Sequence, residues 1–148
     1  ESVCQSFDAA LASLRDGPAG GADEKAAAAC ADLRRRIGAL RGFARTLQNA
    51  CAFQALLDRA RTGGYSPEVN AEALERVMRR EIDNVSELIG LLEAGGAPLL
   101  PLADRAEDEN TFLFGPDLAD QLRRKTELML AHWHDSQMLF NNKTRFNT

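Results

Sequence analysis

The sequence lacks the features that would point directly to a membrane, a redox centre or a phosphate-binding enzyme. No apolar run approaches the ~18 residues needed to cross a bilayer, and no basic start followed by an apolar core marks a signal peptide. There is no Cys-x-x-Cys motif, and no Gly-rich phosphate loop follows a strand, because no strand pattern is evident. The net charge of -4 and the pI of about 5.2 argue against nucleic acid. We therefore expect neither a membrane nor a nucleic acid as a partner.

Cysteine is scarce, with three residues in the chain. Cys30 and Cys51 fall on one expected helix, ~31 Å apart at 1.5 Å per residue. A disulfide requires Cα atoms within ~7 Å, so these two residues cannot pair with each other. A disulfide from Cys4 to one of them is one alternative. The sequence favours the other, in which the cysteines are free thiols that pack as small apolar residues.

Histidine is also scarce, and both copies lie in the segment His132-Trp133-His134-Asp135. Residues i and i+2 of a helix point about 200° apart, so the two imidazoles cannot bind one ion from the same helix. The chain also lacks the Glu-x-x-His pair of di-iron bundles and the His-Glu-x-x-His motif. We expect no metal site and no cofactor, and we interpret Trp133 as a core residue.

What the sequence does contain is the pattern of one helical domain. A chain of 148 residues, 45% hydrophobic and 27% charged, is long enough for one sizeable core and short for two. Glycine and proline divide it into four amphipathic segments, at residues 2–15, 23–61, 66–94 and from about 115 through Trp133 and Phe140. We predict an all-α, up-and-down four-helix bundle over residues 1–148, with the two central helices as a long antiparallel pair. Because the chain opens at Glu1 without a methionine, it is either a processed product or an excised part of a longer protein.

The two central segments each carry an apolar stripe in heptad spacing. The stripe of the first is unbroken: Cys30, Leu33, Ile37, Leu40, Ala44, Leu47 and Cys51. The stripe of the second has one acidic member: Leu74, Met78, Glu81, Val85, Leu88 and Leu92. Such spacing is typical of a seam that packs against other helices. We therefore predict that both stripes are buried.

A long loop of about 20 residues precedes the last helix, and it is too apolar to be a solvated linker. Leu99, Leu100 and Leu102 lie in its first half, and Phe112-Leu113-Phe114 lies at its end. Loops of this length are uncommon in compact domains. Two alternatives remain open: the loop folds back over the end of the bundle, or Phe112, Leu113 and Phe114 dock on another domain or chain.

A few polar residues stand at or beside the expected seams. They are Arg45, Asn49, Glu81, Asn84 and Lys125. A carboxylate at a seam position is costly unless it is paired or hydrogen-bonded. We predict that these residues form a structural polar network that sets the register between helices. Plain solvent exposure is one alternative; a catalytic cluster of Arg45, Glu81 and Lys125, of the kind that binds small dicarboxylates in helical chorismate mutases, is another.

The order of these residues resembles a known family. Arg45, Asn49 and Phe53 on one helix, followed by Glu81-Ile82-Asp83-Asn84 and a leucine-rich end, resemble the helical region after the catalytic barrel in bacterial glycoside hydrolases. Enzymes similar to α-glucuronidases and β-N-acetylhexosaminidases carry such a region. The likeness covers roughly residues 30–130, and Phe112 to Gly115 match the aromatic-Gly segment before the last helix. It implies a non-catalytic helical domain that packs on a catalytic barrel domain outside this chain, in a periplasmic or extracellular protein.

Three functions follow from the sequence. The first is a non-catalytic accessory or structural domain of a larger carbohydrate-active protein, as the resemblance implies. The second is a stand-alone interaction or oligomerisation module that uses the heptad stripe or the loop at residues 97–114. The third is a small helical enzyme with an Arg/Lys/Glu pocket. We expect the first, with a catalytic barrel domain or another protein chain as the partner.

Overall fold

The predicted all-α class is confirmed. The computed structural model describes residues 3–15, 24–62, 67–94, 99–110 and 114–135. These residues form four α-helices and one short 3-10 turn at Ala106–Asp108. The helices are α1 (Val3–Arg15), α2 (Glu24–Arg61), α3 (Pro67–Glu93) and α4 (Leu118–Ala131). Among the described residues, no helix is long and apolar enough to cross a membrane.

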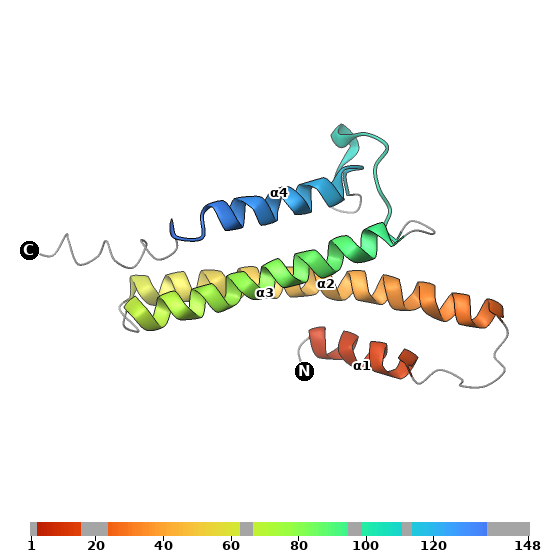
Figure 1. Cartoon of the computed structure of the whole chain (residues 1–148), viewed down its shortest axis with the longest axis horizontal. Helices are drawn as coiled ribbons and strands as arrows, with labels where there is room; N and C mark the ends of the chain where they lie inside the picture. The colour runs from red at the N-terminus through yellow and green to blue at the C-terminus, as the bar shows by residue number, and fades with distance from the viewer. Residues whose placement is uncertain (1–2, 16–23, 63–66, 95–98, 111–113, 136–148) are drawn as a thin grey trace, which may run out of the picture.

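The four helices pack against each other in sequence order (Figure 1). α2 and α3 form the long central pair, α1 packs on the first half of α2, and α4 packs on α3. The pair is antiparallel, since Gly38 meets Leu91 near the end of α3 whereas Asn49 meets Glu81 near its middle. α4 ends at Ala131, earlier than the apolar pattern predicts. Trp133 follows in a turn but still packs on the core, and Phe140 lies outside the described residues.

The predicted burial of the α2 heptad stripe is wrong. Its three leucines, Leu33, Leu40 and Leu47, are 46%, 48% and 67% exposed, and Cys51 is exposed as well. The buried residues of α2 lie on another face and are small or polar: Gly38, Ala39, Gly42 and Asn49. All three cysteines are free thiols, and of them Cys4 is the buried one.

Close packing of large α3 side chains on α2 explains this choice of face. A Cβ atom on Gly38 would lie 3.1 Å from Leu91 Cδ1, and one on Gly42 would lie 3.2 Å from Leu88 Cδ1. The glycines therefore let the α3 leucines approach the α2 backbone, and Leu88 is buried to 1% exposure. A face of leucines on α2 would leave no room for these side chains.

The α3 stripe is buried, as predicted. Leu74, Met78, Glu81, Val85 and Leu88 are all buried, and Leu92 is half-buried at the end of the stripe. Two apolar clusters form along it. One joins Leu88 to Ala39 of α2, and the other gathers Phe53, Met129 and Trp133 around Leu74 and Met78. α3 therefore packs on both α2 and α4, just as α2 packs on both α1 and α3.

The described part of the loop before α4 folds back on the helices. Leu99 is buried against Ala39 and Leu88, and Phe114 stacks on Phe43 of α2 with ring centroids 4.8 Å apart. The Ala103 N–H donates to the Phe114 carbonyl at 2.7 Å, within an isolated bridge between Leu102 and Phe114. This is the first of the two alternatives that the sequence left open. Phe112 and Leu113, the other candidate docking residues, lie outside the described residues.

Candidate functional site

A buried carboxylate lies at the centre of the molecule, where α2, α3 and α4 meet. The Glu81 side chain is 7% exposed and accepts hydrogen bonds from side chains of both α2 and α4. Thr46 Oγ1 donates to Glu81 Oε1 at 2.8 Å, and Asn49 Nδ2 donates to Oε2 at 2.7 Å. The Lys125 ammonium of α4 forms an ion pair with the same Oε1. The buried negative charge is therefore matched by one positive charge and two neutral donors.

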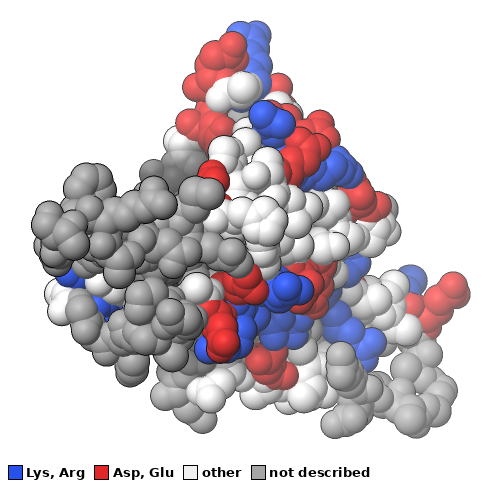
Figure 2. Space-filling view, turned by 60° about the vertical axis from the view of Figure 1, so that its left-hand side comes forward, with Lys and Arg blue, Asp and Glu red and all other residues white. Residues whose placement is uncertain are grey.

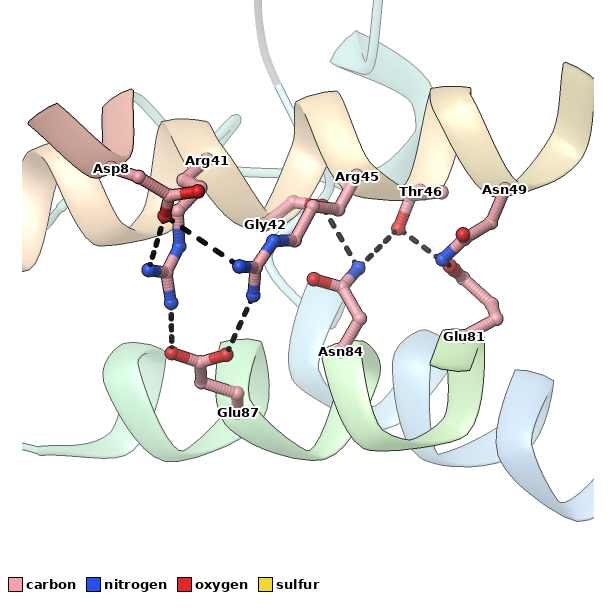
Figure 3. Close-up of polar contacts among 9 residues, drawn as sticks. All are labelled: Asp8, Arg41, Gly42, Arg45, Thr46, Asn49, Glu81, Asn84 and Glu87. Carbon is pink, nitrogen blue, oxygen red and sulfur yellow. Dashed lines mark hydrogen bonds and ion pairs between the residues drawn. The ribbon is translucent and has the colours of Figure 1, made fainter. Parts of the chain in front are cut away.

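Asn84, one turn further along α3, extends this cluster toward α2. Its Nδ2 donates to the Gly42 carbonyl at 2.9 Å and to Thr46 Oγ1 at 3.0 Å (Figure 3). The bond to a helix carbonyl is available because Gly42 carries no side chain to cover it. Asn84 Oδ1 is buried without a hydrogen-bond partner among the described residues. We call Thr46, Asn49, Glu81, Asn84 and Lys125 the buried cluster.

Thr46 is the member of the buried cluster that the sequence analysis missed. It bridges Glu81 and Asn84, so that the two α3 side chains share one α2 partner. Its spacing gives a usable signal, since Thr46 lies three residues before Asn49 and four after Gly42, on the same helical face. A polar triplet Gly-Thr-Asn at that spacing marks the true inner face of α2.

Arg45, which the sequence grouped with Glu81, pairs instead with other carboxylates. Its guanidinium lies 3.4 Å from Glu87 Oε2 and 3.6 Å from Asp8 Oδ1 (Figure 3). Arg41 pairs with the same two residues, at 3.0 Å from Asp8 and at close contact with Glu87. We call Asp8, Arg41, Arg45 and Glu87 the surface cluster, since the Asp8 and Glu87 side chains are both 48% exposed. It connects α1, α2 and α3.

The two clusters differ in what they can do chemically. In the buried cluster, Glu81 Oε1 accepts two hydrogen bonds and Oε2 accepts one, so both carboxylate oxygens are already engaged by groups of the protein. The catalytic alternative needs Arg45 beside Glu81 and Lys125. The structure places Arg45 in the surface cluster, so this triad is not assembled. What remains at the centre is the ion pair of Glu81 and Lys125, whose opposite charges cancel, together with the hydrogen bonds to Glu81.

A cavity of about 540 Å³ adjoins the buried cluster. Its walls come from all three helices around Glu81, and they are mostly apolar. Glu81 and Lys125 lie in the wall, and His132 and Asp135, in the turn after α4, also line the cavity. His132 Nδ1 lies 2.7 Å from Asp135 Oδ2, and both side chains are exposed. Within the described ranges, no group of three or more His, Cys, Asp or Glu side chains is placed to hold a metal ion.

Charged side chains of both signs are interleaved on the surface. Figure 2 shows Lys and Arg next to Asp and Glu at several places on the face that it presents, with uncharged surface between them. Many of these contacts are short-range ion pairs within one helix, such as Arg36 with Asp32 at 2.7 Å and Arg124 with Glu127 at 3.1 Å. Pairs of this kind contribute only ~0–1 kcal/mol each to stability.

No family model, curated protein or solved structure matches this chain. The resemblance to the helical region of glycoside hydrolases therefore depends on the residues already named. Of these, Asn49, Glu81 and Asn84 lie in the buried cluster, Arg45 lies in the surface cluster, and Phe53 lies in the wall of the cavity.

Proposed function

We propose that this chain is a non-catalytic helical module that docks on another domain of a larger, carbohydrate-active protein. The docking face is the leucine stripe of α2, formed by Leu33, Leu40 and Leu47. One observation carries the proposal: among the described residues, Leu33, Leu40 and Leu47 of the unbroken heptad stripe are exposed, as is Cys51, while the other stripe members are half-buried. Full burial of one leucine side chain is worth about 1.5–3 kcal/mol, so three leucines in register offer a partner a substantial apolar contact.

The stripe fits another domain better than a second copy of the chain. In a two-stranded coiled coil, large residues fill both the a and the d positions. Here the leucines occupy one position, and the other holds Cys30, Ile37, Ala44 and Cys51, three of which are small. Self-pairing would leave these layers underfilled. A flatter apolar surface of a separate domain covers such a stripe without gaps.

The identity of the partner is supplied by the resemblance. Helical regions with this order of Arg, Asn, Glu and Asn follow a sugar-cleaving barrel in the similar enzymes, and we propose the same neighbour here. The buried cluster supports the non-catalytic part of the proposal, because Glu81 already binds three donors and Arg45 lies elsewhere. In this role the buried cluster fixes α2 against α3 and thereby keeps the stripe straight.

The test is a binding measurement with the domain encoded next to this chain in its gene. The purified neighbour domain is titrated with the wild-type chain and with the variant Leu40→Gln/Leu47→Gln. We expect the double variant to bind at least tenfold more weakly, while its own melting temperature stays unchanged. Leu130→Gln is the matched control, since Leu130 of α4 is 57% exposed and lies outside the stripe.

Two results would contradict the proposal. If the gene encodes no barrel-type domain beside this chain, the carbohydrate-active context is lost. If light scattering shows a dimer that the double variant breaks, the stripe pairs with a second copy, and the chain is an oligomerisation module instead.

A further inference from the structure

The cavity beside the buried cluster has the size and lining of a small-molecule site. Its volume of about 540 Å³ lies within the ~300–1,000 Å³ typical of ligand pockets. Apolar side chains from three helices form most of its wall: Phe53, Val77, Met78, Leu128 and Met129. It is separate from the docking stripe, because α2 lines it with Thr46, Asn49, Ala50 and Phe53 and not with the stripe leucines.

The polar part of the wall presents a hydrogen-bond donor. The Glu81 carboxylate is occupied by Thr46, Asn49 and Lys125. The Lys125 ammonium has three N–H donors, one of which serves Glu81, and its side chain is 35% exposed. A molecule in the cavity therefore meets the Lys125 ammonium, the paired His132 and Asp135 side chains, and mainly apolar surface elsewhere.

We propose that this cavity binds a small, mainly apolar molecule with a single carboxylate head group. The carboxylate accepts a charge-assisted hydrogen bond from Lys125, which then lies between two carboxylates. The apolar body lies against Phe53, Met78 and Met129. Medium-chain fatty acids and aromatic carboxylic acids share this chemistry, and a neutral acceptor head would bind more weakly because it carries no charge.

Tryptophan fluorescence provides a direct readout. Trp133 is the single tryptophan of the chain and packs against the cluster of Leu74 and Met78, as Met129 of the cavity wall also does. We would titrate the full chain with dodecanoate, with dodecanol as the neutral probe and dodecyltrimethylammonium as the cationic probe. The expected result is saturable binding of dodecanoate at one site, roughly tenfold tighter than dodecanol, with the cation weakest.

Variants locate the site. Lys125→Met should abolish the preference for dodecanoate over dodecanol, and Ala50→Phe, which fills the cavity from α2, should weaken both probes. Because Lys125→Met leaves Glu81 buried without its partner, the double variant Glu81→Gln/Lys125→Met keeps the test available if the single variant does not fold. Leu47→Gln, on the docking stripe, should change neither affinity.

Three outcomes would overturn the proposal. The first is no saturable binding of dodecanoate to the wild-type chain. The second is equal affinity for dodecanoate and dodecanol in both the wild type and the Lys125 variants. The third is binding of dodecanoate that occurs only after residues 136–148 are removed. That result would mean that the chain's own C-terminal residues occupy the cavity in place of a ligand. Since none of these three outcomes depends on the stripe leucines, failure here leaves the docking proposal standing.

Discussion

The two faces of α2 reverse the usual distribution of residues. The fully buried residues of α2 are Gly38, Ala39, Gly42 and Asn49, with Thr46 beside them, whereas the stripe leucines are exposed. Large apolar residues of α2, such as Phe43 and Phe53, still pack on the core, but they are only partly buried. The inner face is stabilised by close approach and by the hydrogen bonds of Glu81 and Asn84. On the outer face the three leucines and Cys51 are exposed, and the other stripe residues are half-buried.

The comparison shows that a regular apolar stripe predicts that a helix face can pack, but not which surface it packs against. On α3 the stripe and the buried face coincide, because α3 supplies the large side chains of the interface. On α2 the stripe and the buried face do not coincide. The large side chains of α3 fill this interface, so the face of α2 opposite them must carry small residues. The unused stripe is then available for contacts outside the chain.

Removal of Glu81 should have the largest effect on the inner face. Glu81→Ala leaves the Lys125 ammonium and the Asn49 and Thr46 donors without their common acceptor, and we expect the free energy of unfolding to fall by about 3 kcal/mol. Urea denaturation measures this change. Glu87→Ala, in the exposed surface cluster, is the control and should cost at most ~1 kcal/mol. Equal losses would show that burial does not distinguish the two clusters.

A methyl group on the inner face should have the next largest effect. Gly42→Ala places a Cβ 3.2 Å from the buried Leu88 side chain, and the overpacking costs about 1–3 kcal/mol, partly offset by ~1 kcal/mol of helix propensity. We expect a net loss of roughly 1 kcal/mol. Gly90→Ala is the matched control, since a Cβ there meets nothing within 4 Å, and it should raise stability by ~0.5–1 kcal/mol. A gain in both variants would argue against close packing at Gly42.

The rates at which the three cysteines react with a thiol reagent compare the outer face of α2 with the core. No substitution is needed, so the stability of the chain is unchanged at the start of the reaction. Cys51, at the end of the stripe, is exposed and should react quickly with a maleimide in the folded chain. Cys4 is buried and should react only on unfolding, whereas half-buried Cys30 should react at an intermediate rate. Mass spectrometry over time gives the three rates. Protection of Cys51 in the isolated folded chain would mean that this end of the stripe is covered.

Much of the fold could be predicted from the sequence, and the errors have a common cause. Glycine and proline predicted boundaries of the first three helices close to the observed ones, and the α3 stripe was correctly assigned, because these are local properties of the chain. The end of α4 at Ala131 was not predicted. The sequence also singled out Asn49, Glu81, Asn84 and Lys125, which the structure brings together. The choice of the buried face of α2 and the position of Arg45 depend on which residues α3 presents, and the regular leucine stripe does not contain that information. The spacing of Gly42, Thr46 and Asn49 is the one local signal for the inner face.

The most direct test of this account is the stability of the isolated chain with all three stripe leucines replaced. If Leu33, Leu40 and Leu47 form an unused outer face, the variant Leu33→Gln/Leu40→Gln/Leu47→Gln should have a free energy of unfolding in urea within about 1.5 kcal/mol of the wild type, since exposed substitutions change stability by ~0.5 kcal/mol or less each. A loss of ~6 kcal/mol or more, as expected for three leucines removed from a core at ~2–5 kcal/mol each, would contradict it. That result would mean that the three stripe leucines are buried in the folded chain.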